Sequence, residues 1–376
     1  MAEFNQNTKP MDRFQHGGDT YGQGDVIDFS ASLNPLGMPD SAQQALRDGV
    51  ASFEAYPDPY CRDLVAAIAR CEHVPACWVT VGVGATDIFA RVAQVVAPSR
   101  ILVLDPCFSG YEQSYAQWAT RFDRAPRAAD AGSSHSSRML PDVVHVALSA
   151  DNDFDVVAQD VTQALESNDI DIVYLCTPNN PTGRALPLCV LEEILDVADS
   201  TGTYVLLDEC FADLAGLESA VPLLSSHSTF IVVKAFTKTF AMAGLRLGYS
   251  ICSDEALAAD LRRAGMEWAV STPSQVAGIA ALEEQGYLAR SQGYIRVGRA
   301  RLEAGLAAFG LRVVPSHANY VLFRSEKLLY DEALARGVVL RRCANFAGLD
   351  DHWYRVAVRT AAENERLLEV LGEVLE

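Results

Sequence analysis

One stretch, TFIVVKAFTKTFAMAGLRLGY from Thr229 to Tyr249, constrains the fold more than any other part of the chain. It opens with a continuous apolar run rich in β-branched residues, which is typical of a strand buried on both faces of a parallel sheet. Lys238 follows that run, and open α/β sheets bind their ligands where their strands end. Partial burial there lowers the pKa of an amine, as a lysine that reacts with a carbonyl compound requires. The stretch therefore predicts an α/β fold with Lys238 as a reactive group.

Arg246 lies eight residues further on, between Gly244 and Gly248. Its guanidinium is a planar fork suited to a phosphate. Either residue alone could be an ordinary surface charge in a loop. A reactive amine and a phosphate clamp on one short segment together suggest pyridoxal 5'-phosphate (PLP), which needs both.

Composition excludes several classes of partner. The chain has 376 residues and a net charge of -19, which argues against nucleic acid or an anionic membrane surface as a partner. No apolar run is long enough to span a bilayer, and the polar N-terminus has no signal-peptide pattern. The nine cysteines form no CxxC pair and no HExxH motif is present, so we expect reduced thiols, no metal site and a cytoplasmic protein.

Further motifs follow other expected strands. Ala85 and Thr86 begin a helix after a Gly-containing turn, so their main-chain amides are a plausible second hold on a phosphate. Phe108 follows the apolar run 101–104 and could stack on a flat cofactor. Asn180 lies between prolines in TPNNPTG, where its amide can bond a phenolic oxygen. Asp208 ends the run 204–207, and a carboxylate buried there needs a partner such as a protonated pyridine nitrogen.

The order of the expected strands and helices predicts one large and one smaller domain. Strands and helices alternate from about 78 to 252, which indicates a mostly parallel sheet with helices on both faces. A helical stretch at 274–308 and later strands and helices indicate a smaller α+β domain. We expect the segment 123–142 to be a surface loop. The predicted divisions are 1–40 (N-terminal arm and small-domain strand), 41–273 (large PLP-binding domain) and 274–376 (linking helix and small C-terminal domain).

The succession of PNNPTG, Asp208, Lys238 and Arg246 resembles the fold-type I aminotransferase superfamily of PLP enzymes. The resemblance implies a large domain with a mostly parallel seven-stranded sheet. It also implies that Lys238 bonds the cofactor and shuttles protons, while Asp208 keeps its pyridine nitrogen protonated. The remaining cofactor contacts implied are Asn180 to the phenolic oxygen, Phe108 to the ring face, and Arg246, Ala85, Thr86 and Thr237 to the phosphate.

A narrower resemblance covers nearly the whole chain. HGG, DFSASLNPLGMP, YPDPY and above all CANFAGLDDHWYRVAVRTAAENERLL are similar to threonine-phosphate decarboxylases of cobalamin biosynthesis, cousins of the histidinol-phosphate aminotransferases. It implies that Arg355 binds a substrate carboxylate and that Arg341, with His16 and Asn34, binds a substrate phosphate. It also implies a homodimer with shared active sites, because a tyrosine like Tyr56 reaches the neighbouring subunit's cofactor phosphate.

The residue types fit more than one activity. The leading hypothesis is decarboxylation of O-phospho-L-threonine to (R)-1-aminopropan-2-yl phosphate in cobalamin biosynthesis. Decarboxylation of O-phosphoserine and transamination of the histidinol-phosphate type are alternatives, and the first differs by only one methyl group. A PLP-binding regulator is a third interpretation, although no basic helix-turn-helix segment precedes residue 40.

Overall fold

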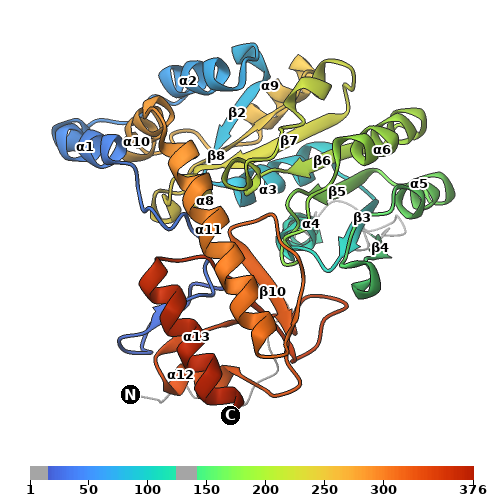
Figure 1. The fold of residues 1–376 in the computed structure, drawn as a ribbon. Helices are drawn as coiled ribbons and strands as arrows, with labels where there is room; N and C mark the ends of the chain where they lie inside the picture. Colours follow the sequence, from blue (N-terminus) through green and yellow to red (C-terminus); the bar gives the residue numbers. More distant parts are fainter. Residues whose placement is uncertain (1–15, 124–141) are drawn as a thin grey trace.

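The computed structural model describes residues 16–123 and 142–376. Its largest element is a seven-stranded sheet with helices on both faces (Figure 1). Every neighbouring pair is parallel except the two that include β8, so the predicted mostly parallel seven-stranded sheet is confirmed. In sheet order the strands are β2 (Val79–Gly82), β8 (Gly248–Ile251), β7 (Phe230–Ala235), β6 (Tyr204–Asp208), β5 (Ile172–Cys176), β3 (Arg100–Asp105) and β4 (Asp142–Ala147).

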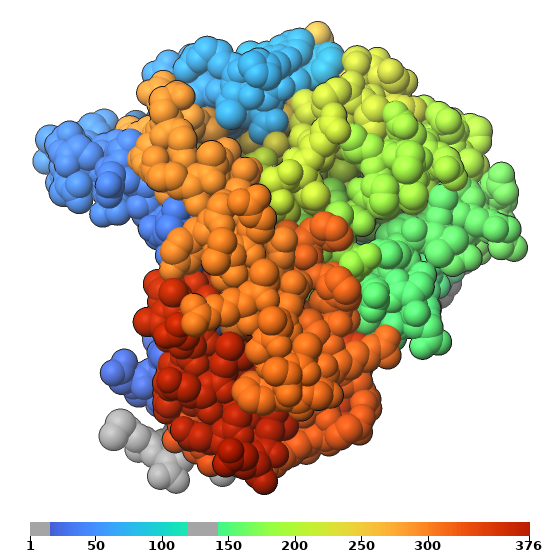
Figure 2. Space-filling view, viewed as in Figure 1, coloured from blue at the N-terminus to red at the C-terminus, as the bar shows by residue number. Residues whose placement is uncertain are grey.

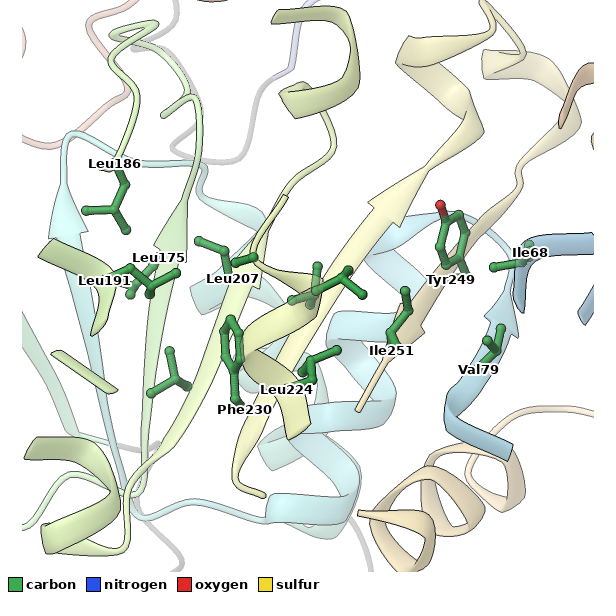
Figure 3. Packing of buried hydrophobic residues seen from close by; sticks show 14 of the residues in the cluster. Ile68, Val79, Leu175, Leu186, Leu191, Leu207, Leu224, Phe230, Tyr249 and Ile251 are labelled. Atoms are coloured by element: carbon green, nitrogen blue, oxygen red, sulfur yellow. The ribbon is translucent and has the colours of Figure 1, made fainter. Parts of the chain in front are cut away.

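The two faces of this sheet carry separate apolar cores. Successive strand residues point to opposite faces, so Val205 and Leu207 pack in one cluster and Leu206 packs in the other. Figure 3 shows the first cluster, where Leu191 lies against Leu175 and where Ile68 approaches Tyr249. Helices α2 (Arg62–Glu72), α5 (Ala158–Ser167), α6 (Leu188–Thr201) and α10 (Thr272–Glu283) contribute to this core, and helices α3 (Ala85–Val96), α4 (Gly110–Asp123) and α9 (Glu255–Arg263) cover the other face.

A second, smaller body surrounds a four-stranded sheet. Helix α11 (Tyr287–Ala308) runs from the large sheet into this body and packs beside α13 (Ala361–Leu375) (Figure 1). The N-terminal strand β1 (Ile27–Asp28) pairs here with β11 (Val338–Val339), so both ends of the described chain join the same body. The four strands in sheet order are β12 (Arg341–Arg342), β13 (Trp353–Ala357), β10 (Tyr320–Arg324) and β9 (Arg312–Val313).

The remaining helices are short or peripheral. Helix α1 (Asp40–Gly49) packs against α10 and projects from the body at the left of Figure 2. The others are α7 (Ala212–Ala215), α8 (Phe236–Thr239) and α12 (Tyr330–Ala335).

The single helical stretch expected at 274–308 is wrong, because the structure has two separate helices there, α10 and α11. The chain turns at Gly286, whose φ of 72° belongs to the left-handed region that glycine adopts readily. The loop expected at 123–142 lies almost wholly at positions 124–141, outside the described residues. Within the described ranges, no helix combines the length and apolar character needed to cross a membrane.

Candidate active site

A cavity of about 280 Å³ lies where the carboxyl ends of β5, β6 and β7 meet the smaller body. The chain reverses at these strand ends, so side chains from separate loops converge there. All of the predicted site residues except Asn34 and Tyr56 line this cavity. They are His16, Ala85, Thr86, Phe108, Asn180, Asp208, Thr237, Lys238, Arg246, Arg341 and Arg355.

Lys238 occupies α8, the short helix that follows β7 directly. Removal from water disfavours the charged amine, and the cations Arg355 and Arg246 add repulsion, so the pKa of Lys238 is lowered to about 8. A larger fraction of this amine is therefore neutral near physiological pH than of an ordinary lysine. That is the form that attacks a carbonyl carbon.

Asp208 ends β6 and is buried. Its Oδ1 accepts a hydrogen bond from the Cys210 amide at 2.9 Å, and its Oδ2 accepts one from the Tyr111 hydroxyl at 2.9 Å. Burial raises the pKa of Asp208, whereas the Cys210 thiol, the two donors above and the charge of Lys238 lower it. A buried carboxylate held in this way can accept a proton-bearing ring nitrogen as its charged partner.

The turn between β2 and α3 forms a cradle for an anion. No side chain caps the start of α3, so its first main-chain amides face outward toward the cavity. Gly84 has a φ of 88°, and a Cβ added there would lie 2.9 Å from Nη2 of Arg246. Only glycine allows the guanidinium this close to the turn. The main-chain amides of α3 and the guanidinium of Arg246 face the same small space, and this combination of donors suits a phosphate group.

Phe108 and Asn180 line the same cavity from two different loops. The Phe108 ring lies 5.3 Å from the His16 ring, and a Cβ added at Gly110 would come within 2.2 Å of Phe108 Cε1. Asn180 accepts a hydrogen bond from Nη1 of Arg355 through its Oδ1. Because Oδ1 is used in this way, Nδ2 of Asn180 remains as a donor, and a phenolic oxygen is a suitable acceptor for it.

Two arginines enter the cavity from the smaller body. Burial lowers the pKa of Arg341 to about 10 and also lowers the pKa of Arg355. Arg341 donates to Oδ1 of Asn345 at 2.9 Å, while Nη2 of Arg355 donates to the Ser30 carbonyl at 2.8 Å. The acceptors in these two contacts carry no formal charge.

The structure corrects the assignment of Asn34 to substrate. Its Nδ2 donates to the Thr239 carbonyl at 2.9 Å and to Ser291 Oγ at 2.8 Å, and its Oδ1 accepts from the Leu36 amide. The side chain therefore braces the Lys238 segment against α11 and does not face the cavity. The resemblance assigned Asn34 to the substrate phosphate, whereas here its amide bonds within the protein.

Sequence reasoning missed the segment Ser30, Ala31 and Ser32, which lines the cavity, and Ser32 is its most informative member. It is 1% exposed and lines the cavity, and its Oγ has no hydrogen-bond partner within the described part of the chain. A buried hydroxyl without a partner is costly unless something else meets it. The sequence does contain one indication of this role. In an extended segment such as SAS (residues 30–32), every second side chain points to the same side.

Tyr56 lies outside the cavity of its own chain. Its side chain is 83% exposed, and its ring is 5.3 Å from that of Trp268, itself 46% exposed. The expected contact between Tyr56 and a neighbouring subunit stays a prediction.

A group of possible metal ligands comes together from β3, α4 and β4, although no metal site was expected. Ligand atoms of Asp105, Glu112 and His145 lie within 4.8 Å of one another. Nδ1 of His145 is 2.6 Å from Oδ2 of Asp105, the length of a direct charge-assisted hydrogen bond. That bond accounts for the approach of these two groups without an ion.

Comparisons with known proteins agree with this geometry. Residues 137–371 match the family described as aminotransferase class I and II, and the chain belongs to that family. Threonine-phosphate decarboxylase of Salmonella typhimurium is 36% identical over 356 residues, covering 93% of this chain and 91% of that protein. Histidinol-phosphate aminotransferase of Methanothermobacter thermautotrophicus is 31% identical over 370 residues, covering 95% and 92%. The crystal structure of a histidinol-phosphate aminotransferase from Clostridium acetobutylicum matches with a TM-score of 0.82 and 27% identity, covering 93% and 99%.

The residues of the cavity fit PLP, the cofactor that the sequence predicts. Lys238 supplies an amine of lowered pKa, Asp208 supplies a buried carboxylate, and the Gly84 turn with Arg246 supplies a phosphate cradle. These are the three kinds of contact that PLP needs. The fold-type I architecture is likewise confirmed.

Proposed function

We propose that the protein decarboxylates O-phospho-L-threonine to (R)-1-aminopropan-2-yl phosphate, with PLP as its cofactor. The observation that carries this proposal is the buried pair Arg341 and Arg355 in the cavity that also holds Lys238 and Asp208. An amino-acid phosphate has two anionic groups, and each arginine offers a planar fork for one of them. Histidinol phosphate has a phosphate but no carboxylate, so it would engage only one fork. The 36% identity to a threonine-phosphate decarboxylase supports the same substrate class.

The proposal gives each cavity residue a task in binding. Arg355 binds the carboxylate, because its contact with Asn180 places it nearest the expected cofactor ring. Arg341 binds the substrate phosphate, with His16 and the Ser32 hydroxyl as neighbouring donors on the same cavity wall. Burial and the charge of Arg341 lower the pKa of His16, so this ring is a neutral donor at physiological pH.

The chemical outcome depends on which bond of the substrate's Cα is held at right angles to the cofactor ring. The bound cofactor supplies a sink for the electron pair that this bond releases. If Arg355 and Arg341 hold the carboxylate out of the ring plane, CO₂ leaves and Cα must take up one proton. The Lys238 amine, with its pKa of about 8, is suited to give that proton near neutral pH. Positioning by the two arginines therefore selects the reaction.

Transamination is the alternative outcome, and the 31% identity to a histidinol-phosphate aminotransferase supports it. It would follow if the cavity held the Cα–H bond at right angles instead. O-phosphoserine is an alternative substrate, because one methyl group is worth only about 1–3 kcal/mol of discrimination. A role in cobalamin biosynthesis and a cytoplasmic location stay predictions.

The test is to incubate the PLP-loaded protein with O-phospho-L-threonine and no keto acid, and to measure CO₂ and the aminopropanol phosphate. Histidinol phosphate with 2-oxoglutarate is the parallel reaction, and O-phosphoserine without keto acid is the third. Release of CO₂ from phosphothreonine alone, at a higher kcat/KM than from phosphoserine, supports the proposal. Turnover that requires 2-oxoglutarate contradicts it and establishes an aminotransferase.

We also propose a homodimer in which Tyr56 completes the cavity of the partner subunit. Tyr56 lies on the surface with Trp268 instead of in the cavity of its own chain. Met266, two residues before Trp268, is 84% exposed. An aromatic and apolar surface of this kind is typical of a protein–protein contact.

A further inference from the structure

Tyr111 is buried beneath the cavity, and the proposed reaction gives it no task so far. It is the second residue of α4, fully buried, and its hydroxyl donates to Oδ2 of Asp208 at 2.9 Å. The two residues are 97 positions apart in the chain. The bond therefore exists only because the fold brings the start of α4 to the end of β6.

Three aromatic rings fix the position of this hydroxyl. The Tyr111 ring stacks on Tyr174 with centroids 5.0 Å apart and meets the edges of Phe89 at 5.2 Å and Phe108 at 5.6 Å. Such contacts restrict the ring to one orientation. The hydroxyl is thus aimed at the carboxylate before any cofactor binds.

Tyr111 is one of two residues whose hydrogen bonds stabilise the ionised carboxylate of Asp208, the other being Cys210. Besides Tyr111, the thiol and the amide of Cys210 both donate hydrogen bonds to Asp208, the amide at 2.9 Å, and Lys238 is the cation that contributes. The thiols of Cys176 and Cys210 are buried and their pKa values are raised, so they carry no charge at neutral pH. Tyr111 is itself a permanent donor, because burial and the charge of Asp208 raise its pKa well above its usual value.

We propose that Tyr111 is a positioning residue that keeps Asp208 ionised and aimed at the ring nitrogen of bound PLP. A hydroxyl stabilises the ionised carboxylate without adding a competing positive charge. The carboxylate can then pair with the protonated ring nitrogen. This inference rests on the PLP part of the proposed function, but not on the choice of substrate.

The experiment compares the PLP-loaded Tyr111→Phe and Tyr115→Phe variants. Tyr115 lies one turn further along α4 and is also buried, but its hydroxyl bonds to that of Tyr174 at 2.8 Å instead of to Asp208. Two quantities are measured: the affinity of the cofactor-free protein for PLP, and the pH midpoint of the visible absorbance of the Lys238-bound cofactor. Thermal unfolding of the cofactor-free proteins reports whether both variants fold.

Tyr111→Phe is expected to weaken PLP binding roughly tenfold, which is the lower range for a hydrogen bond to a charged group. The pH midpoint of the cofactor absorbance is expected to rise by about one unit in this variant. The reason is that the positive charge on the ring nitrogen favours loss of the proton on the nitrogen that joins the cofactor to Lys238. A ring nitrogen that is less often protonated removes this effect. Tyr115→Phe should leave both quantities within about twofold and a few tenths of a pH unit. Equal behaviour of the two variants overturns the proposal.

Tyr111→His gives a second comparison if Tyr111→Phe unfolds at a much lower temperature than Tyr115→Phe. It keeps a ring N–H donor, so its pH midpoint should fall between those of the wild type and Tyr111→Phe, and a midpoint outside that interval overturns the proposal. A wild-type protein that binds PLP but turns over no phosphothreonine contradicts the proposed reaction alone. A wild-type protein that binds no PLP overturns both.

Discussion

Arg341 and Arg355 lie directly opposite each other on the neighbouring antiparallel strands β12 and β13, and both side chains are buried. Residues opposite each other in such a pair share one face of the sheet, where like charges destabilise the pairing. The smaller body therefore carries an electrostatic cost that an anion in the cavity would relieve. This arrangement is expected where a protein binds a substrate with two negative groups.

Substitution of Arg341 tests this relationship. Arg341→Gln should lower kcat/KM for an amino-acid phosphate by roughly 10- to 100-fold, because it removes a charge-assisted contact to the phosphate. Arg342→Gln is the matched control. Arg342 is the next residue of β12, and its guanidinium lies over the Tyr330 ring at 4.5 Å. Steady-state kinetics on both variants decide the matter, and equal losses would refute the assignment of Arg341.

Substitution of Gly84 tests the phosphate cradle. Gly84→Ala should weaken PLP binding by roughly tenfold or more, because its Cβ would displace a phosphate-binding guanidinium. Gly202 has a similar φ of 73° but nothing within 4 Å of an added Cβ. Both alanine variants should lose about 1 kcal/mol of unfolding free energy. Only Gly84→Ala should lose cofactor affinity, as measured by titration of the cofactor-free protein, and an unchanged affinity would rule the cradle out.

The lowered pKa of Lys238 predicts how cofactor capture depends on pH. The neutral amine attacks the aldehyde, so the capture rate should rise with pH and level off above the pKa of about 8. An ordinary lysine would show this midpoint near 10.4. Stopped-flow absorbance after PLP is mixed with the cofactor-free protein gives the profile. A rate that continues to rise beyond pH 10 would show that burial does not tune this amine.

A buried ion cluster behind the reactive segment predicts a stability effect. The amine of Lys234 lies 3.0 Å from Glu72, 3.2 Å from Asp213 and 3.7 Å from Glu209. Lys234→Met would leave three carboxylates without this cation and should cost about 3–5 kcal/mol of unfolding free energy. Arg70→Met removes an exposed pair with Glu283 and should cost at most about 1 kcal/mol. Urea unfolding compares them, and similar losses would contradict this account of the cluster.

Mixed variants test the proposed homodimer. Tyr56→Ala and Lys238→Ala should each be weakly active or inactive alone, whereas a refolded mixture should regain activity. A hybrid dimer would hold one cavity with both residues intact. Activity that does not rise on mixing, with dimers present by light scattering, would show that Tyr56 does not serve the partner's cavity.

Local patterns predict much of the fold and of the cavity. Apolar strands that end in Asp208 or Lys238 can be identified in the sequence, because parallel strands place their carboxyl ends at one edge. Asn34 and Ser32 show where such reasoning fails. Both are polar residues of one segment, and only the packing of that segment against α11 decides which of them faces the cavity. Tyr111 could not be found at all, since its contact with Asp208 depends on tertiary structure.

The cavity joins two bodies that are linked by α11. The smaller body supplies Arg341 and Arg355, while the seven-stranded sheet supplies Lys238 and Asp208. A slight tilt of one body against the other would therefore rotate the substrate over the cofactor without altering any residue that touches either. Relatives with different activities can in this way diverge by substitutions where the two bodies meet, leaving their catalytic side chains identical.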